Sequence, residues 1–296
     1  MSGRAPRGAP RRAAACGALS LLVAAAALAQ TPATHPVTVV ATATGLTVPA
    51  QIPAGPVLFT FTNRARRVVG AQLLAVLGGH SADEAARLLV GGGQPPPWIL
   101  PAGGVGPLAP GLSAGVLQTV AAGTYVIASM LPDSDGVAQF QRGYVVGLRA
   151  AGQARFAQGG ADAVAVLRVG RAFVFQRLAV QNGRRVELQS RMRSAPIRPG
   201  DRVIEVDTRS SAPHEFALVK MDQSVQLRRW PQWIAGGQRG PAPGIAAGGA
   251  AMSPPTALFW LKVHLEPGTY WLLCTAIHSS GRRGFETGEY AQFLVR

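Results

Sequence analysis

The chain repeats itself along its length, and this repeat constrains the fold more than any other feature of the sequence. Four segments recur in the same order, each 144 or 145 residues further on. The pairs are Ile52–Asn63 with Ile197–Thr208, Ala71–Val76 with Glu215–Lys220, Gly123–Ile127 with Gly268–Leu272, and Gly143–Val146 with Gly288–Ala291. Repetition at a nearly constant offset indicates tandem copies of one structural unit. We expect two homologous domains, at 36–150 and 163–296, joined by a linker at 151–162.

The repeated segments have the pattern of β-strands. Short runs rich in Val, Ile, Thr, Phe and Tyr stand between turns marked by many of the 36 Gly and 23 Pro. The sequence therefore predicts an all-β protein of two tandem sandwiches. One short helix is expected in the first domain, where Ser81–Glu84 forms a capping box before helically spaced apolar residues at 85–89. In the second domain we expect a mobile surface loop, Gly236–Pro255, in place of that helix.

The first 29 residues have the organisation of a secretory signal peptide. Four arginines precede an apolar run from Ala13 to Leu28, and Ala27-Leu28-Ala29 is a small-residue cleavage motif. The run is too short for a comfortable bilayer span, and we find no later candidate for a transmembrane segment. We expect an exported protein, periplasmic or extracellular and soluble after cleavage. The pair Arg11-Arg12 leaves both the general secretory and the twin-arginine route open.

Charge and cysteine usage limit the partners of the mature chain. Cleavage leaves 25 basic and 14 acidic residues, a net charge of +11, which favours an acidic protein partner. The arginines are scattered in ones and twos, so we expect no nucleic acid. Cleavage also removes Cys16 and leaves Cys274 as a single cysteine. A lone cysteine in an oxidising compartment is a buried apolar residue, an intermolecular disulfide or a metal ligand.

Three segments of the second domain resemble the cupredoxins, the plastocyanin- and azurin-like copper proteins. They are Ala212-Pro213-His214-Glu215-Phe216, Leu265–Cys274 and the closing strand Tyr290–Val295. The resemblance is to the tandem form found in exported bacterial proteins, with degenerate copper sites. It implies a Greek-key β-sandwich in each domain and a metal held by loops at one end. By the same resemblance, His214 stands where the family has its first copper histidine, and Cys274 where it has the copper cysteine.

The resemblance implies a partial copper site in the second domain. A site of this family has two imidazoles, one thiolate and a weak axial ligand. The family's second histidine position falls on Gly284, but His278 follows Cys274 by four residues, a spacing within the range that cupredoxins use. We therefore predict His214, Cys274 and His278 as metal ligands and copper as the cofactor.

The remaining family positions have changed. The axial methionine position falls on Glu289, so Glu286, Glu289 or a water is the candidate axial ligand. An axial oxygen would lower the reduction potential relative to methionine. In the first domain the four ligand positions are replaced by Gly70, Ser129, Gln139 and Tyr144. These residues cannot hold a copper of this type, and we expect the first domain to be metal-free.

Two classes of function remain open on the sequence. The first is copper binding with electron transfer, and the alternative is a metal-free structural or interaction module on the same scaffold. The run Arg228–Trp233 favours the alternative if it is exposed, although such tryptophan pairs more often fold onto their own domain. Copper oxidases and nitrite reductases need a further histidine-rich centre, and the chain has five histidines. We expect no enzyme, and ordinary roles for His35, His80 and His264.

Overall fold

The computed structural model describes residues 34–92, 94–153, 163–169, 173–181, 184–187, 196–208 and 210–296. The expected signal peptide at 1–29 and residues 154–162 of the expected linker lie outside the described residues. Within the described ranges, no helix combines the length and the apolar character that crossing a bilayer requires.

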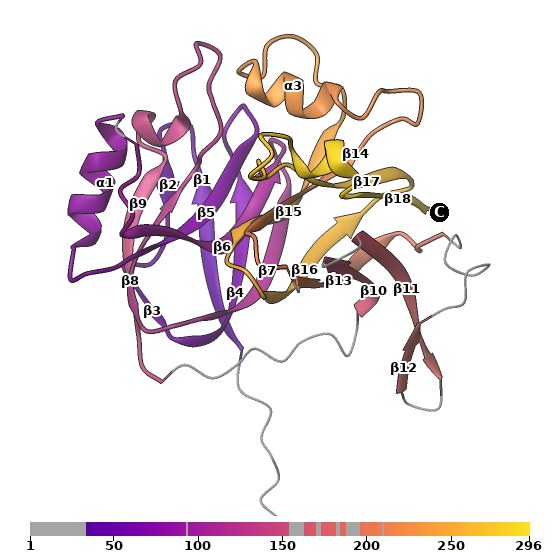
Figure 1. Cartoon of the computed structure of the whole chain (residues 1–296), viewed down its shortest axis with the longest axis horizontal. Helices are drawn as coiled ribbons and strands as arrows, with labels where there is room; N and C mark the ends of the chain where they lie inside the picture. Colours follow the sequence, from indigo (N-terminus) through magenta and orange to yellow (C-terminus); the bar gives the residue numbers. More distant parts are fainter. Residues whose placement is uncertain are drawn as a thin grey trace, which may run out of the picture. The chain divides into compact units, whose positions relative to one another are not determined.

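The first half of the described chain is made of strands with an α-helix between β5 and β6 (Figure 1). The strands are β1 His35–Ala41, β2 Leu46–Thr47, β3 Gln51–Pro53, β4 Gly55–Asn63, β5 Val69–Val76, β6 Ile99–Leu108, β7 Ser113–Val120, β8 Gly123–Ala128 and β9 Val145–Ala151. The helices are α1, Ala82–Val90, and the short 3-10 helix η1, Gln139–Arg142. The first half is therefore mainly β, as predicted.

The second half follows the same plan (Figure 1). Its strands are β10 Ala163–Val169, β11 Phe173–Gln181, β12 Arg184–Glu187, β13 Gly200–Thr208, β14 His214–Lys220, β15 Ile245–Ser253, β16 Leu258–Leu265, β17 Gly268–Cys274 and β18 Tyr290–Val295. The helices are α3, Arg229–Ala235, and the 3-10 helix η2, Gly284–Thr287. A helix in this half departs from the prediction and is treated below.

Both halves distribute their strands over the same two sheets. One sheet has the order β12-β11-β10-β13-β16-β7-β4-β1-β2, and the other has the order β18-β17-β14-β15-β6-β5-β8-β9-β3. In each half the first long strands form a parallel pair, β1 with β4 and β10 with β13. The chain then crosses to the second sheet, returns for a single strand, β7 or β16, and ends in the second sheet. This crossing pattern confirms the predicted all-β fold of two sheets and shows that both halves follow one plan.

The two halves join edge to edge in both sheets. Strand β7 pairs antiparallel with β16, and β6 pairs antiparallel with β15. Each sheet therefore runs without interruption through both halves, with nine strands among the described residues. The domain limits 36–150 and 163–296 stay a prediction.

Alternation along β14 sends its side chains to two different environments. Phe216 and Leu218 belong to the apolar cluster between the sheets, together with Cys274. Ala217 and Val219 belong to a second cluster with Trp230 of α3. Because successive strand residues face opposite sides, β14 can serve one site between the sheets and another on the outer face of its sheet.

Helix α1 forms where the capping box predicts it. The Glu84 amide donates to the Ser81 hydroxyl at 3.1 Å, and Ala85 and Leu89 are buried. The Glu84 carboxylate binds His80 Nδ1 at 2.9 Å rather than the cap backbone. The His80 ring stacks on Trp98, with centroids 3.9 Å apart. His80 therefore has the ordinary local role expected for it.

The prediction of a mobile loop at Gly236–Pro255 is wrong. This range contains β15, which pairs with β14 on one side and with β6 on the other. Gly248 and Gly249 have φ angles of 110° and 125°, which favour glycine. A Cβ on Gly249 would also overlap the carbonyl oxygen of Phe216. The small residues of β15 therefore reflect close packing of backbones rather than mobility.

The prediction that the second half lacks a helix is also wrong, because α3 lies there. Trp230 of α3 is 1% exposed, and its ring centroid is 5.4 Å from that of Trp233. The tryptophan pair is thus folded onto the protein, as such pairs usually are. In the run Arg228–Trp233, Trp230 is buried and Trp233 is half-buried.

Gln72 ties the two halves together across β6. Its side-chain amide donates to the carbonyl oxygens of Leu73, Gly103 and Met252, and its oxygen accepts the Met252 amide at 2.7 Å. Gln72 lies on β5 and Met252 on β15. The amide of one residue therefore satisfies backbone groups of three strands at the join.

Replacing Gln72 with leucine should lower the free energy of unfolding by about 2–4 kcal/mol. The change removes several buried hydrogen bonds and leaves backbone groups unsatisfied. Urea unfolding followed by circular dichroism measures the loss. Gln51→Leu, at an exposed strand position, is the control and should change stability by less than about 0.5 kcal/mol. Equal losses in the two variants would contradict this role of Gln72.

Candidate metal centre

Two neighbouring strands bring the first pair of candidate ligands together. His214 begins β14 and Cys274 ends β17, and the two strands pair antiparallel with Phe216 opposite Cys274. Glu289 immediately precedes β18, which pairs with β17 on its other side. Strand order thus places these three residues at one end of the sheet.

A tight hairpin returns His278 to the same place. The His278 amide donates to the Arg282 carbonyl at 2.9 Å, and the Gly281 amide donates to the His278 carbonyl at 2.9 Å. Ile277 and Arg283 form an isolated antiparallel bridge at the base of this turn. His278 can therefore lie beside Cys274 despite the short spacing, because the chain reverses direction directly after His278.

The structure brings all three predicted ligands together and adds Glu289. One potential ligand atom from each of His214, Cys274, His278 and Glu289 lies within 4.8 Å of every other. The sulfur of Cys274 is 3.5 Å from His214 Nδ1. Glu289 Oε2 is 3.4 Å from His214 Nδ1 and 3.2 Å from His278 Nε2. This is the only such group of His, Cys, Asp and Glu among the described residues.

Gly284 leaves the space that this cluster occupies. A Cβ at this position would lie 2.6 Å from the Cys274 sulfur and 2.7 Å from its Cβ, and would overlap Glu289 Oε2. The Gly284 carbonyl also accepts the Glu289 amide at 2.9 Å. The position where the resemblance expects a second histidine is therefore a glycine that makes room for Glu289.

Of the axial candidates named from the sequence, Glu289 is the one in contact with the cluster. Its carbonyl accepts the Cys274 amide at 2.9 Å, which ties it to the end of β17. Glu286 instead uses its carboxylate to accept the Arg283 amide at 2.8 Å and is exposed. Sequence spacing could not separate the two, because the choice depends on how η2 turns the chain.

Burial shifts the pKa values of Cys274 and His214 in opposite directions. Burial raises the pKa of the Cys274 thiol, and the Glu289 carboxylate raises it further. Burial lowers the pKa of His214, against the opposing effect of Glu289. His214 is therefore held as a neutral imidazole, the form that binds a metal, whereas the thiol would lose its proton only to an incoming cation.

Buried polar atoms of the cluster have no hydrogen-bond partner among the described residues. They are His214 Nε2, His278 Nε2 and Glu289 Oε2. The close approach of His278 and Glu289 has the length but not the geometry of a hydrogen bond. Because buried polar atoms are nearly always satisfied, this convergence fits a donor set for a cation.

In the first half the equivalent residues bond to one another. The Ser129 hydroxyl lies 2.7 Å from the Gln139 side-chain oxygen and 3.1 Å from the Gly70 amide that donates to it. The Gln139 amide donates to the Val68 carbonyl at 3.0 Å. The Tyr144 hydroxyl donates to the Thr42 carbonyl at 2.9 Å. These contacts satisfy the polar side chains locally, which fits the expected structural role of this half.

The remaining histidines lie apart from the cluster. His35 begins β1, His80 stacks on Trp98, and His264 Nδ1 lies 2.8 Å from Asp201. His80 and His264 therefore have partners of their own outside the cluster. Sequence reasoning did not single out Glu215 and Thr275, which follow His214 and Cys274 directly, although strand alternation next to these two ligands was the available signal.

Comparisons with known proteins give only distant likenesses. No protein-family model matches the chain, and no curated protein sequence matches it. A copper-containing nitrite reductase from Thermus scotoductus SA-01 is 13% identical with a TM-score of 0.25 and covers 89% of this chain and 62% of its own. The chain thus spans less than two thirds of that protein.

Two further solved structures give the same picture. A copper nitrite reductase from Nitrosomonas europaea is 12% identical with a TM-score of 0.25 and covers 89% of this chain and 94% of its own. A multicopper oxidase is 13% identical with a TM-score of 0.24 and covers 89% of this chain and 88% of its own. These TM-scores are too low to support an activity.

Proposed function

We propose that the protein binds one copper ion through His214, Cys274, His278 and Glu289. The observation that carries this proposal is the convergence of four ligand atoms within 4.8 Å at one end of the sheet. Thiolate and imidazole ligands favour copper and zinc over calcium or magnesium. Two imidazoles and one thiolate with a weak axial ligand, usually Met and in some sites an oxygen, form the donor set of copper electron-transfer sites.

The surroundings of the cluster support electron transfer. When bound, copper would supply one-electron exchange. Cys274 and His214 are buried and would keep water from the metal, whereas the His278 side chain is 23% exposed. Its neighbour Ile277 is 63% exposed. His278 therefore provides a short path from the cluster to an apolar point on the surface, where a redox partner could approach.

The histidines favour binding over catalysis. His214 and His278 are used by the cluster, and the other three of the five lie apart. A second histidine-rich copper centre of the oxidase or nitrite reductase kind therefore has too few ligands in this chain. Export through the signal peptide at 1–29 and an acidic partner for the +11 mature chain remain part of this proposal.

The test is loading with Cu(II). The mature protein is titrated with Cu(II), desalted and assayed for metal and visible absorption. We expect one retained copper per chain and a strong Cys–Cu(II) band. A parallel loading with Zn(II), which has no visible transition, measures preference for the metal. Copper that passes through the desalting column would overturn the proposal.

The alternative is a metal-free scaffold, and one observation favours it. The first half has already replaced the equivalent residues with the hydrogen-bonded pair Ser129 and Gln139. If neither metal is retained, the second half serves the same structural purpose with a different set of contacts. Thermal unfolding with and without Cu(II) then shows equal midpoints, because only a bound ligand stabilises the folded state.

Glu289→Met should raise the reduction potential of the bound copper, on the order of 100 mV. Two unit charges about 4 Å apart interact by about 4 kcal/mol at an effective dielectric constant of about 20, so removing the Glu289 charge would destabilise Cu(II) relative to Cu(I) by a few kcal/mol. Spectroelectrochemistry of the loaded variants measures the shift. Glu286→Met, at an exposed carboxylate outside the cluster, is the control. A potential that is lower or unchanged in Glu289→Met would exclude Glu289 as a ligand.

A further inference from the structure

The strand ends that carry the candidate metal ligands also border a cavity on the opposite face of their sheet. His214 and Cys274 lie in the cluster, whereas the next residues, Glu215 and Thr275, line the cavity. Its volume is about 400 Å³. Strands of both halves, β5 and β6 of the first and β14 and β15 of the second, form its floor.

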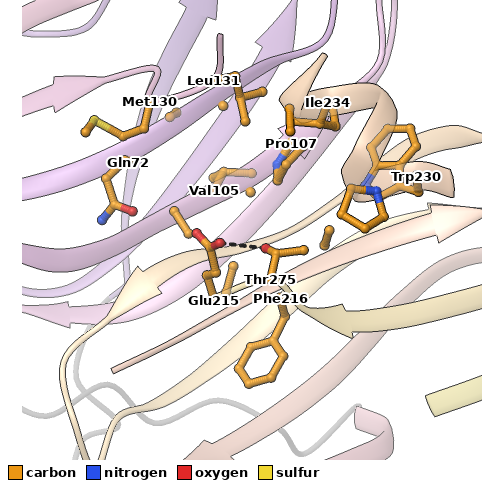
Figure 2. A pocket seen from close by; sticks show the side chains of 18 of the residues that line it. Gln72, Val105, Pro107, Met130, Leu131, Glu215, Phe216, Trp230, Ile234 and Thr275 are labelled. Atoms are coloured by element: carbon orange, nitrogen blue, oxygen red, sulfur yellow. Dashed lines mark hydrogen bonds between the residues drawn. The ribbon is translucent and has the colours of Figure 1, made fainter. Parts of the chain in front are cut away.

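The walls of this cavity are mainly apolar (Figure 2). Trp230 and Ile234 of α3 lie on one side, and Met130 and Leu131 lie on another. Trp230 is 1% exposed, whereas Met130 is 39% exposed. The cavity is therefore lined by an aromatic ring and aliphatic side chains.

Polar groups gather at one end. The Thr275 hydroxyl donates to Glu215 Oε1 at 2.6 Å, the bond drawn in Figure 2. The Arg283 guanidinium donates to the Thr275 carbonyl at 3.0 Å and also lines the cavity. No described residue donates a hydrogen bond to Glu215 Oε2. One carboxyl group, whose pKa is raised by burial, and one guanidinium therefore face the same end.

Helix α3, which covers the cavity, is connected to the first half by hydrogen bonds of the residues that follow it. Gln238 follows α3 and has a φ of 60°. Its side-chain oxygen accepts the Val68 amide at 2.8 Å, and its side-chain amide donates to the Val68 carbonyl at 3.0 Å. Arg239 donates to the Ser134 carbonyl. These contacts hold α3 above the sheet, so the cavity exists before any ligand enters.

We propose that this cavity binds a small neutral aromatic molecule with a hydroxyl group, of the phenol class, with its hydroxyl at Glu215 and Arg283. The site is separate from the metal centre and does not depend on it.

Size, lining and polar groups each support this ligand class. A few hundred cubic ångströms with apolar walls and a few convergent polar groups is typical of small-molecule sites. An aromatic ring gains from contact with Trp230 and Met130. A hydroxyl can donate to Glu215 Oε2 and accept from Arg283. A neutral hydroxyl is both a donor and an acceptor, so it matches an end that offers one carboxyl group and one guanidinium.

Calorimetric titration of the full mature protein with p-cresol tests the proposal. A chelator in every sample removes any contribution from bound metal. We expect saturable binding of p-cresol and, for toluene, which lacks the hydroxyl, about tenfold weaker binding. Equal binding of p-cresol and toluene would overturn the role of the polar end, and no binding of p-cresol would overturn the site.

Variants locate the binding. Ile234→Trp fills the cavity and should abolish p-cresol binding, and Glu215→Gln should weaken it about tenfold. Leu88→Trp, at an exposed position on α1, is the matched control and should bind p-cresol like the parent protein. Thermal unfolding of each variant confirms that it is folded. Unchanged affinity in Ile234→Trp would place p-cresol elsewhere and contradict the proposal.

Discussion

Replacing Gly284 with alanine is expected to weaken copper binding about 10- to 100-fold and to lower the free energy of unfolding by about 1–3 kcal/mol. The reason is steric, since the new Cβ would lie 2.6 Å from the Cys274 sulfur and would overlap Glu289 Oε2. The cluster cannot simply yield, because Cys274 and Glu289 are linked by a backbone hydrogen bond of 2.9 Å. Competition titration with a copper chelator and urea unfolding of the metal-free protein measure the two effects.

Gly123→Ala is the matched control for this change. Gly123 begins β8, and an added Cβ would come no closer than 3.6 Å to the side chain of Tyr125. Copper affinity should stay the same in this variant, and any change in stability should be below about 1 kcal/mol. If Gly284→Ala retains the copper affinity of the parent protein, the ligands do not bind in the arrangement described.

The repeat in the sequence predicts that the two halves share one arrangement of strands, because it indicates two copies of one fold. The segments beginning at Ile52 and Ile197 lead into the equivalent strands β4 and β13. The alternating pattern in each copy gives a sheet with one apolar face, which must be buried against a second sheet. A sandwich buries the apolar faces of both sheets. The capping box at Ser81 likewise predicts α1, because its signal is local. Features that depend on residues close together in the sequence, such as α1, could thus be predicted from the sequence.

The errors occur where distant contacts determine local structure. Residues 245–253 contain small residues and glycines, the composition of a loop. They form β15 because β14 and β6 lie on either side and leave space only for small side chains. The pairing of β6 with β15 and of β7 with β16 was missed for the same reason. Contact between strand edges of two domains does not change the hydrophobic periodicity of either strand, so the sequence does not indicate it.

Among the candidate metal ligands, too, those marked by local sequence patterns could be predicted, and the one that depends on distant contacts could not. His214 and Cys274 follow from motifs at the ends of strands, and His278 follows from its spacing to Cys274. Glu289 could be named only as one of several axial candidates. Its place in the cluster depends on the turn through η2 and on its backbone bond to Cys274, neither of which the sequence displays.

Replacing Cys274 with serine is expected to abolish the visible band and to weaken copper binding about 100-fold. A site worth about 12 kcal/mol and shared among four ligands loses about 3 kcal/mol with one of them. The hydroxyl also stays protonated, so it supplies neither negative charge nor charge-transfer absorption. Serine is close in size to cysteine, and circular dichroism and thermal unfolding of the metal-free variant verify that the fold persists.

Ser129→Cys is the reciprocal variant, because Ser129 is the first-half equivalent of Cys274. Its neighbours are Gly70 and Gln139 rather than imidazoles, so it should gain a thiol but no visible band with Cu(II). A band in this variant would mean that one cysteine in this fold is sufficient for the absorption, and it would contradict the proposed roles of His214 and His278 as ligands. A band that survives in Cys274→Ser would have to come from a different site. The two variants together therefore test whether the donor set, rather than the thiol alone, makes the metal centre.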